Sequence, residues 1–251
     1  MNRLSGKAGL VTGAAGGIGS AAARAFAAEG AAVGLIDVAG PALDRVRADI
    51  GDAAMALAAD VTDEAQVSGQ MRRWAGRHGR ADFLYVCAGC QLHGSDGPVG
   101  EVPLNVWNAT LAVNLTGTFL TVKHGIELLC AAPSGSLILC GSPTGLTMTG
   151  AGYAAYAASK AGMMSLARTT AADYAARGVR ANVIVPGTTA TPLIASLLAD
   201  PAVRDRLISG SPIGRLGTPQ DLTGIAVFLA SDESRYATGA TFCVDGGLTQ
   251  R

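Results

Sequence analysis

Charged side chains are scarce in this chain of 251 residues. Lysine and arginine together number 19, aspartate and glutamate together also number 19, and the formal net charge is zero. Such a balance offers no electrostatic attraction for nucleic acid or for an anionic membrane surface, so we expect neither as a partner. Hydrophobic residues make up 49% of the chain, and we therefore expect much apolar surface to be hidden, some of it between subunits.

A targeting signal and a membrane span are also missing from the pattern. Residues 1–9 are mixed in character and run directly into a strand pattern, which is unlike the apolar core of a signal peptide. No charge occurs between Glu127 and Lys160, but Pro133, Pro143 and five glycines interrupt this segment, which disfavours a spanning helix. We therefore expect a cytoplasmic protein.

Cysteine is used in a way that argues against disulfides. The chain has five cysteines, an odd number with no pairing pattern, which is typical of reduced thiols in the cytosol. Cys87 and Cys90 have the spacing of a redox or zinc half-site, but no second pair of Cys or His residues has ligand spacing. We expect small residues at a strand end there, and no metal site.

Apolar runs of strand length alternate with alanine-rich stretches of helix length. The runs are continuously apolar, which is typical of strands covered on both faces. Repeated strand–helix–strand units predict a parallel sheet with helices on both sides, that is, one doubly wound, Rossmann-type α/β domain of about seven strands over residues 1–251. Residues 188–212 fit no strand, contain three prolines, and are expected to form a helical lid. We expect strands at 8–12, 32–37, 55–59, 83–87, 136–140, 179–185 and 241–244, and helices near 18–29, 40–50, 63–77, 103–131, 152–176 and 219–230.

The first expected strand runs into a glycine-rich loop, Thr12-Gly-Ala-Ala-Gly-Gly-Ile-Gly19. Its glycines let the backbone turn sharply and approach a ligand, and the helix that follows presents free N–H groups to a pyrophosphate. Asp37 ends the second strand, eighteen residues past Gly19, close to the spacing expected of a ribose-binding carboxylate. The sequence therefore predicts a dinucleotide site that includes Gly13, Gly17, Ile18, Gly19 and Asp37.

Asp37 also bears on the choice of cofactor. A carboxylate accepts hydrogen bonds from the ribose hydroxyls but repels a 2′-phosphate, and neither Ala14–Ala15 nor Val38-Ala39-Gly40 supplies a cation. We therefore expect NAD rather than NADP. Asp60 and Val61 follow the third strand and are expected to contact adenine, although Asp60 could equally cap the helix 63–77.

Tyr156 and Lys160 lie four residues apart in an expected helix, and therefore on the same face. A nearby ammonium stabilises phenolate and lowers a phenol pKa from its free value of ~10. A shift of two to three units requires about 3–4 kcal/mol, which one cation a few ångströms away can supply at an effective dielectric near 20. The pair then suits proton transfer to or from a reacting hydroxyl, while the alternative is an ordinary surface pair.

These features together resemble the short-chain dehydrogenase/reductase family. The resemblance covers nearly the whole chain and rests on the glycine loop, the Tyr156-x-x-x-Lys160 pair, Ser142, and Asn114 in the sequence VNLTGTF, together with VRANVIVPG at 179–187 and VDGG at 244–247. It implies a catalytic tetrad of Asn114, Ser142, Tyr156 and Lys160 and a homotetramer. Ser142 is expected to bind the substrate oxygen, and Lys160 to hold the nicotinamide ribose. The expected role of Asn114 is to open a backbone carbonyl to a proton relay.

The resemblance also assigns further cofactor contacts and exposes two departures. The family's usual Asn-Asn-Ala-Gly is here Val86-Cys87-Ala88-Gly89, and Ser142 precedes Tyr156 by fourteen residues, one more than the commonest spacing. We expect looser hydrogen bonding after the fourth strand and a changed substrate mouth. The remaining implied cofactor contacts are Ala88, Gly89, Tyr156, Lys160, Pro186, Gly187, Thr188 and Thr191.

The sequence therefore predicts an NAD-dependent oxidoreductase that interconverts a small secondary alcohol and a ketone. The alternatives are a methyltransferase that uses S-adenosylmethionine, a dinucleotide-binding protein without catalysis, and an NADP-dependent 3-oxoacyl carrier-protein reductase. His93 is expected to be a surface-loop residue rather than a ligand of a polar substrate. Tyr153 could face either the substrate or a neighbouring subunit.

Overall fold

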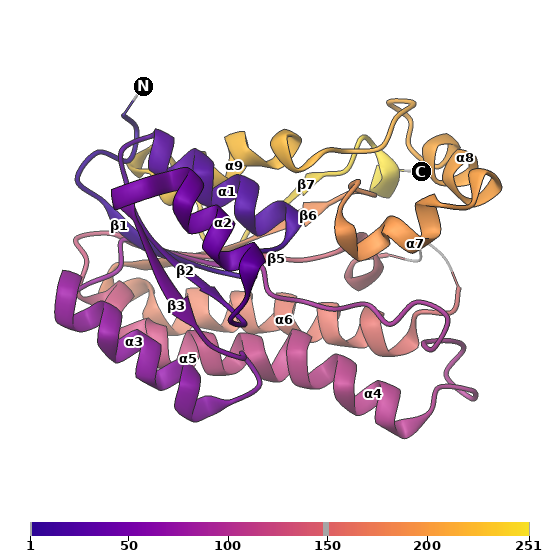
Figure 1. Cartoon of the computed structure of the whole chain (residues 1–251), viewed down its shortest axis with the longest axis horizontal. Helices are drawn as coiled ribbons and strands as arrows, with labels where there is room; N and C mark the ends of the chain where they lie inside the picture. The colour runs from indigo at the N-terminus through magenta and orange to yellow at the C-terminus, as the bar shows by residue number, and fades with distance from the viewer. Residues whose placement is uncertain (1, 148–150, 251) are drawn as a thin grey trace.

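A parallel sheet forms the centre of the computed structural model, which describes residues 2–147 and 151–250. In this part of the chain the sheet has seven strands in the order β3-β2-β1-β4-β5-β6-β7, and every neighbouring pair is parallel (Figure 1). This order confirms the predicted doubly wound α/β fold. The strands are β1 (Ala8–Thr12), β2 (Ala32–Asp37), β3 (Ala54–Ala58), β4 (Phe83–Val86), β5 (Gly135–Cys140), β6 (Val179–Pro186) and β7 (Thr241–Val244).

Helices cover both faces of the sheet (Figure 1). One face carries α1 (Gly17–Ala28), α2 (Pro41–Ile50) and α9 (Thr223–Ala230), while the other carries α3 (Glu64–His78), α5 (Gly117–Cys130) and α6 (Ala154–Tyr174). This arrangement explains the continuously apolar strands, because side chains on both faces are buried. All residues of β1, β4, β5 and β6 are buried.

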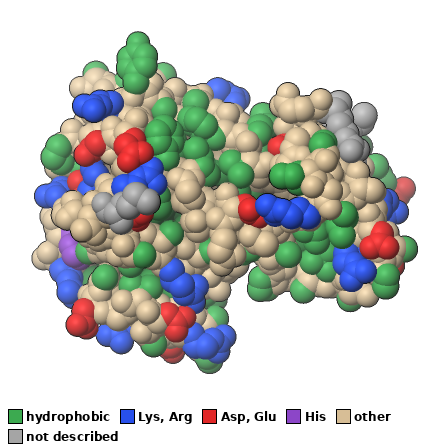
Figure 2. Space-filling model, turned by 90° about the horizontal axis from the view of Figure 1, so that it is seen from above, with side chains coloured by type: hydrophobic (Ala, Val, Ile, Leu, Met, Phe, Trp, Pro, Cys, Tyr) green, Lys and Arg blue, Asp and Glu red, His purple; other side chains and the backbone are tan. Residues whose placement is uncertain are grey.

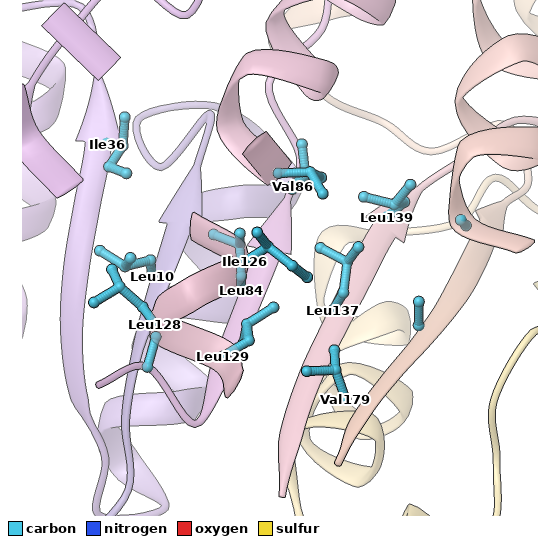
Figure 3. Close-up of a cluster of buried hydrophobic side chains, with 14 of the residues drawn as sticks. Leu10, Ile36, Leu84, Val86, Ile126, Leu128, Leu129, Leu137, Leu139 and Val179 are labelled. Atoms are coloured by element: carbon cyan, nitrogen blue, oxygen red, sulfur yellow. The ribbon is translucent and has the colours of Figure 1, made fainter. Parts of the chain in front are cut away.

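The core beneath the sheet is shown in Figure 3. Leu10, Leu84 and Leu137 come from three neighbouring strands and pack with Ile126 and Leu129 of α5. Each fully buried side chain of this size contributes about 1.5–3 kcal/mol relative to its exposed state. The layer fixes the strand ends rigidly, and the residues that follow those ends are therefore positioned by the core.

The predicted helix 103–131 is interrupted in the structure. It consists of α4 (Leu104–Leu111), a π-helical segment (Ala112–Thr116) and α5, and the interruption surrounds the buried Asn114. π-Helical segments are rare and occur often at functional sites. A hydrophobic pattern could not reveal the π-helical turn, because one extra residue in a turn leaves the composition of the helix unchanged.

The predicted lid is helical. It begins with a 3-10 turn (Pro192–Ile194), continues in α7 (Ala195–Leu198) and α8 (Pro201–Ser209), and is held at its base by a bridge between Thr189 and Gly217. Figure 2 looks down on the side of the molecule that carries α9, α1 and the lid, and on this face positive and negative side chains are interspersed. Within residues 2–147 and 151–250, no helix combines the length and apolar character needed to cross a membrane.

Candidate active site

The candidate site lies at the carboxyl ends of the paired strands β1 and β4, where the order of the strands reverses. The chain leaves β1 toward β2 on one side, whereas β4 and β5 lie on the other. Such a switch point leaves a crevice into which the following loops project, and ligands bind there in open α/β sheets. The glycine loop, the segment after β4 and the lid all meet at this edge.

The glycine loop has the shape that a close backbone approach requires. Gly13 has a φ of 66°, and a Cβ there would lie 2.7 Å from the amide nitrogen of Ala88. A Cβ on Gly19 would clash with the carbonyl oxygen of Gly13. No side chain caps α1 at Gly16, and its first turn has no acidic residue. The helix N-terminus is therefore open to an anion, and the residues fit a pyrophosphate.

Asp37 lies at the edge of this loop. Its carboxylate accepts one hydrogen bond from the amide of Ala15 at 2.8 Å and another from the amide of Val38 at 2.8 Å. The side chain thus ties the end of β2 to the glycine loop and places a negative charge beside it. This placement is the one expected of a ribose-binding carboxylate.

Asp60 bonds to the residue two positions on and does not cap the helix that follows. Its carboxylate accepts hydrogen bonds from the amide and hydroxyl of Thr62, both at 2.8 Å. The N-cap of α3 is Asp63, whose side chain accepts from the amide of Gln66, so the expectation that Asp60 caps this helix is wrong. Val61 is buried, and a Cβ on Gly117 would lie 2.8 Å from its side chain.

The segment after β4 is held by Thr12, a residue that the sequence analysis did not single out. The buried Thr12 hydroxyl accepts hydrogen bonds from the amides of Cys87 at 3.2 Å and Ala88 at 3.3 Å. These bonds keep Ala88 and Gly89 beside the glycine loop although the two amide side chains are missing. The expected loosening at this strand end is therefore offset by a hydroxyl from β1.

Lys160 points into the protein. Its side chain is only 4% exposed, and its ammonium donates a hydrogen bond to the carbonyl oxygen of Cys140 at 2.8 Å. The same nitrogen lies 5.7 Å from the ring centroid of the half-buried Tyr156. The alternative of an ordinary exposed pair on a helix surface is therefore wrong, since the cation is held between α6 and the end of β5.

Asn114 joins the same centre from the π-helical segment. Its side chain accepts from the amide of Cys90 at 2.8 Å and donates to the carbonyl of Cys90 at 2.9 Å and to the hydroxyl of Ser159 at 3.0 Å. A Cβ on Gly89 would lie 3.3 Å from the Asn114 amide oxygen and 3.5 Å from the Lys160 ammonium. Gly89 therefore marks the point where Asn114 and Lys160 converge. The backbone carbonyl of Asn114 accepts from Thr118 at 2.7 Å.

Ser142 follows β5 and is almost fully buried. Its backbone is extended, with φ −158° and ψ 149°, as expected of a residue before proline. Its hydroxyl shares a hydrogen bond of 2.9 Å with the hydroxyl of Thr144. The additional residue between Ser142 and Tyr156 falls in a region that includes a 3-10 turn at Pro143–Gly145, where a Cβ on Gly145 would lie 2.9 Å from the amide of Ala161.

Two thiols meet below the site, Cys87 and Cys140, which the sequence pattern did not pair. The register of β4 and β5 aligns Val86 with Leu139, so Cys87 and Cys140 follow as neighbours. A hydrogen bond from Cys87 and the charge of Lys160, against the opposing effect of burial, lower the pKa of Cys140 to about 7, whereas the same bond and burial raise the pKa of Cys87. Across the described ranges, no group of three or more Cys, His, Asp or Glu side chains is placed to bind a metal.

The lid closes onto the glycine loop at its base. A Cβ on Gly17 would lie 2.7 Å from the Thr191 methyl group, and a Cβ on Gly187 would lie 2.6 Å from the Cα of Asp245. Gly187 also donates to the carbonyl of Val244 at 3.0 Å. These contacts bring Pro186, Gly187, Thr188 and Thr191 to the rim of the crevice, where their expected cofactor contacts would be made.

A carboxylate that the sequence analysis missed holds the start of α6. Asp96 accepts from the amides of Ala155 at 3.1 Å, Tyr156 at 2.9 Å and Gly97 at 2.9 Å. The carbonyl of Gly97 accepts from the amide of Ala154. About sixty residues separate Asp96 from the helix that it caps, so no local signal could have identified it.

A cavity of about 440 Å³ lies beside the start of α6. Tyr153 lines it together with Pro98, Val99, Leu146 and Ala157. Neither Tyr156 nor the glycine loop lines this cavity. We place the reacting centre in the crevice, because the buried cation and the glycine loop lie there. Tyr153 therefore faces a space next to the site, which is compatible with either of its two expected roles.

Known proteins are similar to this chain in sequence and in fold. A family model described as "Enoyl-(Acyl carrier protein) reductase" matches residues 13–249. Cis-4-hydroxycyclohexanecarboxylate dehydrogenase of Sinomonas cyclohexanicum is 41% identical over 242 residues, covering 96% of this chain and 95% of that protein. A protein described as "Inactive 2-(S)-hydroxypropyl-CoM dehydrogenase 2", from Xanthobacter autotrophicus, is 39% identical over 231 residues, with 90% and 99% covered.

A solved structure agrees with these relatives. The gluconate 5-dehydrogenase of Burkholderia cenocepacia J2315, in complex with NADP and tartrate, is 34% identical with a TM-score of 0.92, covering 100% of this chain and 98% of that one. Fold and site together define an oxidoreductase of the type that uses a nicotinamide dinucleotide. The chain belongs to the short-chain dehydrogenase/reductase family, as the sequence predicted. The methyltransferase alternative is thereby removed.

Proposed function

We propose that this protein is an NAD-dependent oxidoreductase that interconverts a small secondary alcohol and a ketone. The observation that carries the proposal is the buried ammonium of Lys160, which lies between the ring of Tyr156, the end of β5 and the Gly89–Asn114 contact. A cation placed there has a clear chemical use, because it stabilises a phenolate one helical turn away.

The nicotinamide cofactor, when bound, supplies the hydride chemistry, and the chain supplies binding, orientation and proton handling. The open N-terminus of α1, with Gly13, Gly17, Ile18 and Gly19, would hold the pyrophosphate. Asp37 would accept from the ribose hydroxyls, and Asp60 and Val61 would border the adenine. On the nicotinamide side, Ala88, Gly89, Pro186, Gly187, Thr188 and Thr191 line the rim.

Proton transfer is assigned to the side chains on α6 and β5. As a phenolate, Tyr156 takes the proton of the substrate hydroxyl in oxidation, and as a phenol it returns that proton in reduction. The Lys160 ammonium stabilises the phenolate form of Tyr156. Ser142 donates a hydrogen bond to the substrate oxygen. For Ser142 to donate in this way, Thr144 must be the donor in the hydrogen bond of 2.9 Å between the two hydroxyls. Asn114 keeps the segment after β4 in place and connects Lys160 to a proton path.

The preference for NAD rests on Asp37. Its two hydrogen bonds to backbone amides fix a carboxylate where the ribose would lie. A unit negative charge 4 Å from a phosphate charge costs about 1–4 kcal/mol between bulk water and an effective dielectric near 20. The solved relative contains NADP in its own structure. For this chain, the proposed preference for NAD over NADP is argued from Asp37.

We further propose that the chain acts as one catalytic domain in a cytoplasmic homotetramer. Leu104 on α4 is 72% exposed, and Phe119 on α5 is 47% exposed. An apolar surface of this kind, beside a helix α6 of low charge, suits a subunit contact. The non-catalytic alternative has one specific observation in its favour, namely the relative described as inactive.

The decisive experiment compares Tyr156→Phe with the unchanged protein. A panel of secondary alcohols and ketones is tested with NAD and with NADP by the absorbance of the reduced cofactor. We expect turnover with NAD, and a loss of about 10²–10⁴-fold in kcat in the variant, because the proton donor and acceptor is gone. Calorimetry should show unchanged dinucleotide binding. Two outcomes would contradict the proposed role of Tyr156. One is retained turnover in the variant, and the other is loss of dinucleotide binding together with loss of turnover.

A further inference from the structure

The segment between β4 and α4 contains a histidine whose environment is unusual. His93 is half-buried, and its Nε2 atom is shielded from solvent and has no hydrogen-bond partner among residues 2–147 and 151–250. Leaving a buried polar group unpaired costs about 1–3 kcal/mol, and native proteins rarely carry such a group without a reason. His93 lies in a loop, as expected, but its Nε2 atom lacks a partner that a bound ligand could supply.

The two ends of this segment are anchored to the candidate catalytic residues. Cys90 is held on both its amide and its carbonyl by Asn114. Asp96 is bonded to the amides of Ala155 and Tyr156 at the start of α6. His93 lies midway between these anchors, so it is positioned by the same groups that build the reacting centre.

The segment turns back immediately after His93. Gly94 has a φ of 77°, and the amides of Ser95 and Asp96 both donate to the carbonyl of Leu92. A left-handed backbone at this point favours glycine. The turn holds His93 in place, and the backbone of Leu193 in the lid lies next to its ring.

The contact with the lid decides which tautomer is present. Burial lowers the pKa of His93, and a hydrogen bond with the backbone of Leu193 opposes part of that shift. The ring is therefore neutral near pH 7. Since Nε2 has no partner, the bond to Leu193 engages Nδ1, and a bond that favours the protonated ring is one in which Nδ1 donates its hydrogen. Nε2 is then the bare nitrogen and can only accept.

We infer that His93 Nε2 accepts a hydrogen bond from a second hydroxyl group of the substrate, so that the enzyme acts on secondary alcohols that carry another hydroxyl. This inference rests on the proposed function, because it places that second hydroxyl beside the same crevice. A hydroxyl is the simplest oxygen function that donates, whereas a carboxylate would find no hydrogen on Nε2 in this tautomer. His93 is thus assigned as a specificity-determining residue that also contacts the lid.

The test uses rigid substrates that differ in one group. Cyclohexanol is the parent alcohol, the three regioisomeric cyclohexanediols add a hydroxyl, and 4-hydroxycyclohexanecarboxylate adds an anion instead. The variants are His93→Leu, which removes the acceptor, and His93→Gln, which restores one. His124→Leu is the matched control, because His124 contacts Glu64 on α3.

We expect His93→Leu to lower kcat/KM for at least one cyclohexanediol about 10-fold, the size of one hydrogen bond of ~1.4 kcal/mol. Cyclohexanol should stay within about twofold, His93→Gln should recover part of the loss, and His124→Leu should change neither substrate. An equal change for the diols and cyclohexanol would overturn the inference and assign Nε2 to a bound water. A selective loss for the carboxylate would overturn it too, since a carboxylate can bond to Nε2 only if that atom carries a hydrogen.

Substrate binding separates this inference from the proposed chemistry. Diol affinity is measured by calorimetry with the NAD-loaded Tyr156→Phe protein, with and without His93→Leu. If the unchanged protein oxidises no alcohol but His93→Leu weakens diol binding about 10-fold here, the hydride-transfer proposal fails and the role of His93 stands. If alcohols are oxidised but His93→Leu leaves diol binding and the diol-to-cyclohexanol ratio unchanged, the role of His93 fails alone.

Discussion

Removing the carboxylate of Asp96 should damage the enzyme twice, in stability and in catalysis. In Asp96→Ala the amides of Ala155 and Tyr156 lose their acceptor at the start of α6, and Gly97 loses a third bond. Loss of a helix N-cap costs about 0.5–2 kcal/mol, and loss of a negative charge at a helix N-terminus costs about 0.3–1 kcal/mol. We therefore expect the free energy of unfolding to fall by about 1–3 kcal/mol.

The catalytic effect follows from the position of the bonds. Tyr156 is itself one of the two capped residues, so fraying of this turn moves the phenol relative to Lys160. A displacement of about 1 Å in a reacting group can cost on the order of 10²-fold in rate. We expect kcat to fall at least about 10-fold while KM for NAD changes little, because the glycine loop and Asp37 are untouched.

The assay pairs urea denaturation with steady-state kinetics, and Asp63→Ala is the matched control. Asp63 is the N-cap of α3 and accepts from the amide of Gln66 at 3.0 Å, so its loss should weaken stability by a comparable amount without touching α6. Asp96→Asn retains an acceptor oxygen and should recover part of kcat. If both alanine variants lose similar stability and both keep full kcat, Asp96 is only a structural cap and the reasoning about Tyr156 is refuted.

Two further predictions follow from single contacts. Asp37→Arg should move the ratio of kcat/KM for NAD and NADP toward NADP by at least about 10-fold, since it removes a repulsion and adds a phosphate-binding cation; an unchanged ratio in the same absorbance assay would show that the ribose site has been misplaced. Gly89→Ala should lower kcat strongly with little change in thermal stability, because the new methyl group lies 3.3 Å from the Asn114 amide oxygen and 3.5 Å from the Lys160 ammonium; near-normal turnover would mean that these groups can move apart freely.

Much of the fold could be predicted because its signals are local. Each strand is a short apolar run, β1, β4, β5 and β6 are buried on both faces, and β1, β2 and β7 begin and end where the sequence predicted. The glycine loop, Asp37 and the Tyr156–Lys160 spacing are also local patterns. The lid was predicted from its prolines and from the lack of a strand pattern, and its helices agree with that expectation.

The features that could not be predicted depend on residues far apart in the chain. Thr12 holds the amides of Cys87 and Ala88 across the β1–β4 boundary, and Cys140 meets Cys87 only because of the β4–β5 register. The cap that Asp96 supplies spans about sixty residues. Such contacts are decided by strand order and loop path, and a hydrophobic pattern contains neither.

The burial of Lys160 links stability to function in this fold. An ammonium that is 4% exposed has lost most of its hydration, and burying a charge is expensive unless it is paired. Among residues 2–147 and 151–250, no carboxylate lies within ion-pair distance of Lys160, and its recorded hydrogen bond goes to the carbonyl of Cys140. Three donors with one acceptor leave capacity for a ribose hydroxyl and for a phenolate. On the proposed function, the cofactor and Tyr156 would complete the partners of this cation, which would account for a buried charge at the crevice.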